Sequence, residues 1–181
     1  MKVAVALLLA LSSGIPRVSL GQPPYQQAAD SARLFPSVSG SNLEGRKFSL
    51  PADFGGDFNV VLVAFKREQQ NDVDTWLPFL RETTARRSDV RVYELPTLNR
   101  GYRFMRGVID GGMARGIPER ATREATITLY IDKSPFKQAL GIDSESQIRI
   151  YLVARGGRVL WHGNGRYSEE LASALAAMLA K

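Results

Sequence analysis

Few side chains in this chain could act as nucleophiles, general bases or soft metal ligands. Its 181 residues include no cysteine and one histidine, His162. Disulfide exchange and thiol peroxidase chemistry need a thiolate nucleophile, so the composition excludes both. Zinc and copper sites generally use several imidazole or thiolate ligands, and one histidine cannot supply them. We therefore predict no catalytic residue, no cofactor and no metal site.

One alternative for catalysis stays open. His162 follows Trp161 at the end of an expected strand, and an imidazole can serve as a general base near neutral pH. Arg67 and Glu68 lie near the start of the first expected helix and could contribute charge to a site there. The sequence shows no nucleophile or orienting partner for His162, so a structural or surface role is the other reading. The corresponding alternative function is an enzyme with non-thiol chemistry.

A second candidate site is basic. Arg100, Arg103 and Arg106 recur at three-residue spacing, which places them on one face of a helix expected over residues 100–115. Such a face suits a docking patch for anionic lipid headgroups or an acidic protein partner. A run of charges is also typical of a solvated helix face. We take these three arginines as the candidate partner-binding residues.

The N-terminal segment has the pattern of a secretory signal peptide over residues 1–21. A basic start is followed by the apolar run 3–11 and by small residues at a cleavage site after Gly21. The apolar run is shorter than the roughly 20 residues that span a bilayer. A retained membrane anchor and a mitochondrial presequence are the alternatives. We expect an exported protein, periplasmic or secreted.

The remaining chain is expected to form a flexible lead-in over residues 22–35 and one domain over residues 36–181. Without residues 1–21 the formal net charge falls from +6 to +4, which is too mild for a nucleic-acid-binding protein. Peripheral contact with a membrane remains compatible with this charge.

Hydrophobic patterning predicts an α/β domain. The Val-rich run 59–65 is typical of a central strand that is buried on both faces. Val73, Trp76, Leu77 and Leu80 share one face of a helix, into which Pro78 should introduce a kink. Further elements are expected as a hairpin at 43–50, strands at 90–95, 125–131, 147–154 and 158–162, and helices at 100–115, 134–141 and 168–179. Their order predicts a central mixed sheet with helices on both faces.

This order, which ends in strand, Gly156-Gly157 turn, strand and helix, resembles the thioredoxin-like superfamily. The resemblance implies a three-layer α/β/α sandwich with a central mixed sheet. In redox members a cysteine nucleophile lies at the N-terminus of the first helix, where the helix dipole lowers its pKa. The equivalent stretch here, residues 65–70, contains no Cys, Ser or Thr, and no proline precedes the strand at 147. Both halves of the redox site are therefore missing.

A narrower resemblance covers residues 115–175 best and residues 36–178 loosely. Its motifs are residues 115–120 (RGIPER), 136–142 (FKQALGI), 150–153 (IYLV), 157–165 (GRVLWHGNG) and 169–171 (EEL). These are similar to the mitochondrial ATP synthase assembly-factor family, a divergent thioredoxin-like group that acts as a chaperone for a membrane-sector subunit. The resemblance implies a non-redox binding protein, a chaperone or assembly factor, whose partner is a subunit of a membrane protein complex. The expected export signal departs from that family, so its function transfers by analogy.

Overall fold

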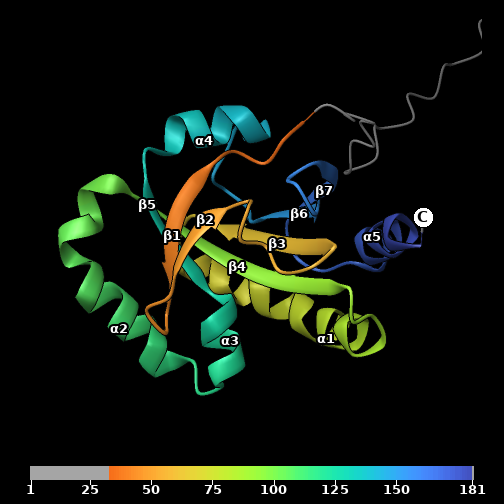
Figure 1. The fold of residues 1–181 in the computed structure, drawn as a ribbon, viewed down its shortest axis with the longest axis horizontal. Helices are drawn as coiled ribbons and strands as arrows, with labels where there is room; N and C mark the ends of the chain where they lie inside the picture. The colour runs from red at the N-terminus through yellow and green to blue at the C-terminus, as the bar shows by residue number, and fades with distance from the viewer. Residues whose placement is uncertain (1–32, 181) are drawn as a thin grey trace, which may run out of the picture.

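A computed structural model describes residues 33–180 of the chain. Within them, seven strands form one mixed sheet in the order β2-β1-β5-β4-β3-β6-β7 (Figure 1). Strands β3, β4 and β5 are parallel, and the remaining pairs are antiparallel. The strands are β1 (Val38–Asn42), β2 (Lys47–Leu50), β3 (Phe58–Ala64), β4 (Val90–Asn99), β5 (Ile127–Ile131), β6 (Arg149–Ala154) and β7 (Val159–Asn164). The predicted signal peptide lies outside the described residues.

Helices cover both faces of this sheet, so the predicted three-layer α/β/α arrangement is confirmed (Figure 1). The α-helices are α1 (Gln70–Arg86), α2 (Arg106–Gly116), α3 (Arg120–Ala125), α4 (Lys133–Leu140) and α5 (Glu169–Leu179), and the 3-10 turns are η1 (Arg67–Gln69) and η2 (Arg100–Met105). Strand β3 is central, as its apolar run predicts: Val60 and Leu62 point into one core cluster, Val61 and Val63 into the other.

One face of the sheet is covered by α1 and α5. Val73, Trp76 and Leu80 of α1 are buried there, as their spacing predicts. The helix continues through Pro78 to Arg86, although proline removes one backbone donor. Helix α5 buries Leu171 and Leu175, and its first turn is capped by Ser168, whose hydroxyl accepts a hydrogen bond from the Leu171 amide at 3.3 Å.

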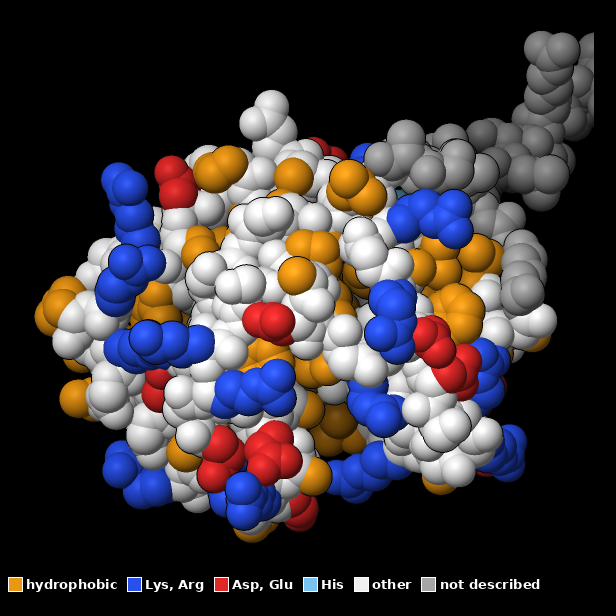
Figure 2. Space-filling view, in the orientation of Figure 1, with side chains coloured by type: hydrophobic (Ala, Val, Ile, Leu, Met, Phe, Trp, Pro, Cys, Tyr) orange, Lys and Arg blue, Asp and Glu red, His pale blue; other side chains and the backbone are white. Residues whose placement is uncertain are grey.

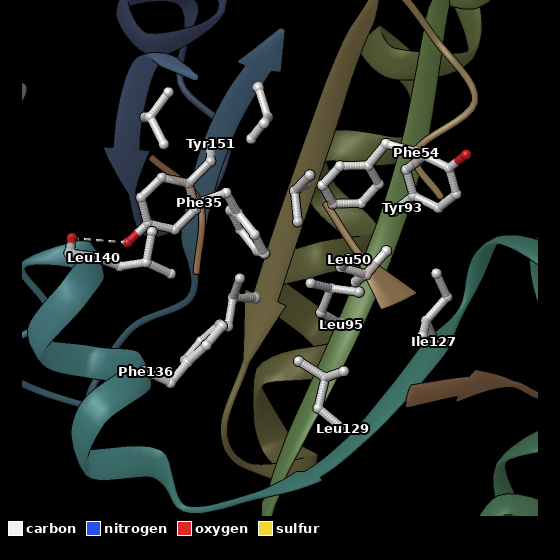
Figure 3. Packing of buried hydrophobic residues seen from close by; sticks show 14 of the residues in the cluster. Phe35, Leu50, Phe54, Tyr93, Leu95, Ile127, Leu129, Phe136, Leu140 and Tyr151 are labelled. Atoms are coloured by element: carbon white, nitrogen blue, oxygen red, sulfur yellow. Dashed lines mark hydrogen bonds between the residues drawn. The ribbon is translucent and has the colours of Figure 1, made fainter. Parts of the chain in front are cut away.

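The opposite face is covered by α4 and by the segments that flank β1 and β2 (Figure 3). Phe35 lies at the centre of this cluster, with ring contacts to Phe54, Phe136 and Tyr151. Phe35 is 2% exposed, and its amide donates to the Gly157 carbonyl at 2.7 Å. Residues 33–35 therefore belong to the packed domain. The lead-in predicted over residues 22–35 extends too far, because the aromatic ring of Phe35 fills the core.

Several predicted boundaries need correction. The strand expected to end before Pro96 continues as β4 to Asn99. Pro96 lies where pairing with β3 ends, opposite Ala64, and pairing with β5 begins, at Thr97. A residue without an amide donor is tolerated at this change of partner. Helix α4 begins at Lys133 and is capped by Asp132, whose carboxylate accepts from the Ser134 amide at 3.0 Å.

The helix expected over residues 100–115 divides into η2 and α2, and a further helix, α3, follows. Met105, Ile109 and Met113 recur at four-residue spacing, but none of them is buried. Four of the eleven residues of α2 are glycines, which have no side chain to bury. Figure 1 shows α2 on the flank of the domain, beyond β1 and β5.

Candidate functional site

The N-terminal end of α1 is closed by a glutamine. Gln69 is 3% exposed, and its side-chain oxygen accepts hydrogen bonds from the Phe65 amide at 2.8 Å and the Lys66 amide at 3.3 Å. Its side-chain nitrogen donates to the Glu145 carbonyl at 2.8 Å. Gln69 thus ties the end of β3 to the loop before β6. In redox domains of the fold that the sequence resembles, this stretch carries the nucleophile. In this chain it carries a side-chain amide whose oxygen and nitrogen are both hydrogen-bonded to the backbone.

Beside Gln69, a carboxylate bridges two lysines. Glu145 accepts from Lys133 at 2.6 Å and from Lys137 at 3.0 Å, and the Lys133 ammonium lies 5.7 Å from the centre of the Phe65 ring. Partial burial of Glu145 raises the pKa of its carboxyl, but the hydrogen bonds from the two lysines outweigh this effect and hold the pKa below its ordinary value. The charge of Glu145 offsets one of the two lysine charges, and the ion pairs link α4 to the loop that Gln69 also contacts.

The substitution Glu145→Gln should make stability less dependent on pH. Because the folded-state pKa of Glu145 lies below its ordinary value of 4.5, its stabilising effect is complete above that value and is lost as pH falls through the folded-state pKa. At pH 7 we expect the variant to lose about 1 kcal/mol, since the ion pairs are partly screened by solvent. Urea unfolding at pH 7 and at pH 3 measures the difference, which should shrink in acid. A constant difference would contradict this account.

The structure does not bring the alternative catalytic residues together. Arg67 and Glu68 are exposed on η1, beyond the end of β3. His162 lies in β7 opposite Tyr151, which in turn pairs with Val61 in the middle of β3. Two strand spacings, each about 4.8 Å, and several residues along the strands therefore separate His162 from η1. The imidazole instead packs near the Tyr151 ring, with centroids 6.2 Å apart.

Two of the three candidate arginines help to hold the η2–α2 segment onto the sheet. Arg103 donates to the Tyr130 carbonyl at 3.1 Å, and Arg106 pairs with Asp110 at 3.2 Å. Asp110 also accepts from the Tyr130 hydroxyl at 2.8 Å, and the Arg106 guanidinium lies 6.0 Å from the Tyr130 ring centre. Burial, followed by the hydrogen bond to Asp110, raises the pKa of Tyr130 above its ordinary value. Arg100 is exposed at the start of η2.

The outer side of the same segment carries an exposed apolar surface. Its members, here called the η2–α2 patch, are Tyr102 (52% exposed), Phe104 (85%), Met105 (39%) and Val108 (69%). Figure 2 shows basic side chains gathered over this flank, with apolar side chains at its outer edge. Large apolar side chains that are exposed together on one short segment mark a candidate interaction surface. The sequence drew attention to the arginines, whereas the structure adds the apolar side chains between them.

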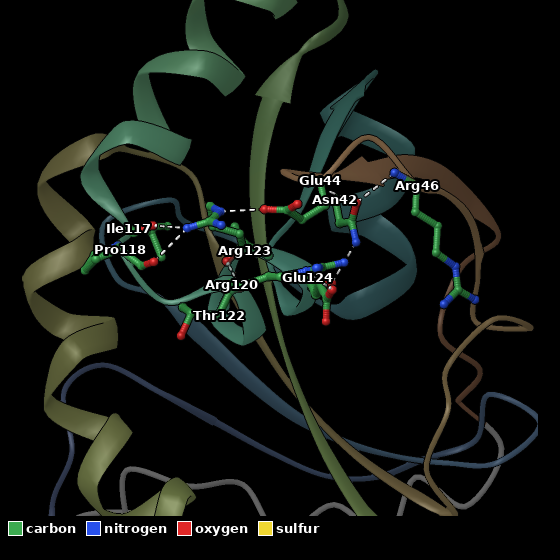
Figure 4. A network of polar contacts seen from close by, with 10 residues as sticks. Asn42, Glu44, Arg46, Ile117, Pro118, Arg120, Thr122, Arg123 and Glu124 are labelled. Atoms are coloured by element: carbon green, nitrogen blue, oxygen red, sulfur yellow. Dashed lines mark hydrogen bonds and ion pairs between the residues drawn. The ribbon is translucent and has the colours of Figure 1, made fainter.

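The arginines downstream of α2 have a different role. Arg123 pairs with Glu44 at 2.5 Å and donates to the carbonyls of Ile117 and Pro118 at 2.9 and 2.8 Å (Figure 4). Arg120 pairs with Glu124 at 2.8 Å. The pair with Glu44 fastens α3 to the turn between β1 and β2, so Arg123 serves the fold.

Sequence reasoning missed Gln69 and Tyr130. Gln69 stands between charged and polar neighbours, where a polar residue reads as exposed. Tyr130 sits in an apolar run and reads as core. Their bonds join residues that are distant along the chain, and a single sequence carries no signal for such contacts.

The described residues offer neither a metal cluster nor a membrane span. No group of three or more His, Asp or Glu residues within 33–180 is placed to bind a metal ion. Among the helices of the same residues, none is long and apolar enough to cross a membrane.

Comparison with known proteins rests on structure. No protein-family model matches the sequence, and no curated protein matches it. Solved structures resemble it over most of its length. The chain has a thioredoxin-like fold. Yeast Sco1 with copper bound is 15% identical with a TM-score of 0.54, and the match covers 89% of this chain and 96% of Sco1. BsSco, of the Sco family of cytochrome c oxidase assembly proteins, is 14% identical with a TM-score of 0.54, and the match covers 81% of this chain and 93% of BsSco. A putative thiol:disulfide interchange protein DsbE from Chlorobium tepidum is 15% identical with a TM-score of 0.51, and the match covers 83% of this chain and 96% of DsbE.

The structural similarity establishes the thioredoxin-like fold, and at these low sequence identities it does not establish a shared activity. Sco1 binds copper in its structure, but the residues of this thioredoxin-like chain do not fit such a site. The chain has no cysteine and a single histidine, whereas copper sites are built from thiolate, thioether and imidazole ligands. Redox chemistry of the kind named for DsbE likewise has no thiol to use here.

Proposed function

We propose that this protein is a non-redox binding protein, a chaperone or assembly factor for a membrane protein complex, and that the η2–α2 patch is its docking surface. The observation that carries the proposal is the exposure of Phe104 and Val108, which are 85% and 69% accessible although both are strongly apolar. A partner that covered these side chains would remove them from water, and that burial is favourable.

The architecture around the patch supports this role. Arg103 and Arg106 bind Tyr130 and Asp110, so the segment that carries the patch is held against β5 in the free protein. A docking surface that is already ordered loses less conformational entropy on binding. Arg100, beside the patch, leaves its charge in solvent and suits an acidic partner surface or lipid headgroups. Of the three arginines, Arg100 is the first candidate for contact with an acidic group of the partner, and Arg103 and Arg106 come second.

The composition and the fold point in the same direction. A thioredoxin-like domain without cysteine, in which the buried Gln69 immediately precedes the first α-helix, retains the scaffold and lacks the thiol chemistry. One structural neighbour belongs to a family of cytochrome c oxidase assembly proteins, and the motifs within residues 115–175 are similar to an ATP synthase assembly-factor family. The sequence of residues 1–21 favours action outside the cytoplasm, in the periplasm or after secretion.

Site-specific photocrosslinking tests the docking surface. A photoreactive amino acid replaces Phe104 in the full chain, expressed in the native cells, and the matched control carries the same group at the exposed Arg166. We expect position 104 to crosslink reproducibly to an integral membrane subunit and position 166 not to do so. The substitutions Val108→Glu and Arg100→Glu should each reduce the yield of that crosslink at least several-fold, by removing apolar contact and by reversing charge.

The same variants should leave folding intact. Val108 and Arg100 are exposed, so we expect each substitution to change the free energy of unfolding by less than about 0.5 kcal/mol. Urea unfolding provides this control. Equal crosslinking from positions 104 and 166, or a crosslink that neither substitution weakens in folded protein, would contradict the proposal.

A further inference from the structure

A groove lies between α1 and α3, over the face of the sheet that α1 covers. Its volume is about 370 Å³, which falls in the range of small-molecule sites. Figure 2 shows a hollow between these helices, with apolar atoms in its depth and basic side chains at its rim. Most of the lining is aliphatic, including Leu62, Val73, Leu77, Leu80, Val92 and Ala125.

The α3 wall of the groove is fixed in position. Two contacts fasten α3 to the β1–β2 turn (Figure 4). Arg123 forms an ion pair with Glu44, and the side-chain amide of Asn42 donates to the Glu124 carbonyl at 3.0 Å. Thr126, at the end of α3, is 1% exposed and donates from its hydroxyl to the Thr122 carbonyl at 2.9 Å. The groove is therefore built into the fold.

Glu94 places a buried carboxyl group in the lining of the groove. Along β4, Val90, Val92 and Glu94 alternate toward the same face, so Glu94 occupies a position where an aliphatic residue is expected. It is 9% exposed and lies opposite Leu62 of β3. Within residues 33–180 no basic side chain forms an ion pair with it. Leaving a carboxylate buried among apolar groups without a cation is costly.

The charged groups around Glu94 come from α1 and β4, and Thr122 and Thr126 add hydroxyl groups from the α3 side. Burial raises the pKa of Glu94 to about 7, a hydrogen bond from Gln70 lowers it in part, and the negative charge of Asp74 raises it further. Arg81 of α1 and Arg91 of β4 line the rim, and Arg91 bonds the Ser88 and Val90 carbonyls at 2.8 and 2.9 Å. None of the lining residues contributed by β3 or α3 is charged.

We propose that this groove binds a small apolar molecule bearing one protonated amine, with the Glu94 carboxylate receiving the ammonium group. The aliphatic walls accommodate the hydrocarbon body, and the ammonium supplies the cation that the buried carboxylate lacks. A ligand carboxylate would meet like charge at Glu94, and an uncharged hydrocarbon would leave Glu94 without a cation. This site is separate from the η2–α2 patch and does not depend on the proposed docking role.

Calorimetric titration of the full chain with three matched probes tests the proposal. Hexylamine should bind, and hexan-1-ol and hexanoate should bind at least tenfold more weakly. Hexylamine stays protonated at pH 6 and at pH 8, since alkylamines titrate near about 10.4, as lysine does. Because the pKa of Glu94 is about 7, its ionised fraction rises from about one tenth to nine tenths over this range. Affinity for hexylamine should therefore be roughly tenfold higher at pH 8.

Two variants separate binding from folding. Glu94→Gln keeps the shape of the side chain and should abolish both the preference for the amine and the dependence on pH. Ala121→Trp, at an exposed position on the groove, should block all three probes while circular dichroism stays unchanged. The proposal is overturned if hexylamine does not bind, if hexan-1-ol binds equally well, or if folded Glu94→Gln binds hexylamine as tightly as the parent protein.

Discussion

Replacing Trp76 with alanine should lower the free energy of unfolding by about 4 kcal/mol, because the residue is fully buried between α1 and the sheet. Its indole ring contacts Phe79 and Tyr167, with centroids 6.3 and 5.6 Å away, and its nitrogen donates to the Gly165 carbonyl at 3.1 Å. The substitution leaves a cavity and an unpaired buried carbonyl. For a domain of this size the loss corresponds to a decrease in Tm of about 8–16 °C. Guanidinium unfolding followed by circular dichroism measures it.

A matched pair of substitutions separates the hydrogen bond from the packing. Trp76→Phe and Trp161→Phe each remove an indole from the same core cluster. The Trp76 nitrogen has a partner, whereas the buried Trp161 nitrogen has none among the described residues. Trp76→Phe should therefore cost about 1–3 kcal/mol more than Trp161→Phe. Equal losses would show that the bond to Gly165 adds little stability.

The second large effect is expected at Gln69. Gln69→Leu preserves volume but removes two acceptor contacts, to the Phe65 and Lys66 amides, and one donor contact, to the Glu145 carbonyl. Backbone groups left unpaired near a buried position cost about 1–3 kcal/mol each, and partial access of water at this loop reduces the sum. We expect a total loss of about 3 kcal/mol in urea unfolding.

Two controls accompany this substitution. Gln69→Glu keeps the acceptors for both amides and loses only the donor to Glu145, so it should cost less than Gln69→Leu. Arg67→Ala changes an exposed neighbour in the same turn and should stay within about 0.5 kcal/mol of the parent protein. If Gln69→Leu were as mild as Arg67→Ala, Gln69 would not be the residue that closes this end of the sheet.

In this thioredoxin-like domain without thiols, the position of the redox site has become structural. The end of α1 is stabilised by an amide with three backbone contacts, which makes the segment a structural connection. Surface features elsewhere then become the candidates for function. The η2–α2 patch offers apolar side chains to a macromolecule, and the groove over Glu94 offers an enclosed carboxyl to a small one.

Much of the fold could be predicted from local patterns. The apolar run of β3, the one-face spacing of Val73, Trp76 and Leu80, and the Ser168 cap each follow from forces that act within a few residues. The missing redox chemistry follows from composition alone. Local patterns carry no information on partners that are distant along the chain, so the predicted element boundaries that depend on such partners were wrong. Phe35 joins the core through rings far along the chain, and β4 passes Pro96 because its partner changes there.

The sequence by itself determined the α/β class, the order of most elements and the exclusion of thiol catalysis, because periodicity and residue inventory are local properties. Only the tertiary structure decided which polar residues are buried and which apolar residues are exposed. Glu94 becomes a groove carboxyl because β4 turns it toward α1 and α3, and Phe104 stays in solvent because α2 lies on the flank of the domain. Burial is a property of the assembled layers, and residues from several separate segments create it together.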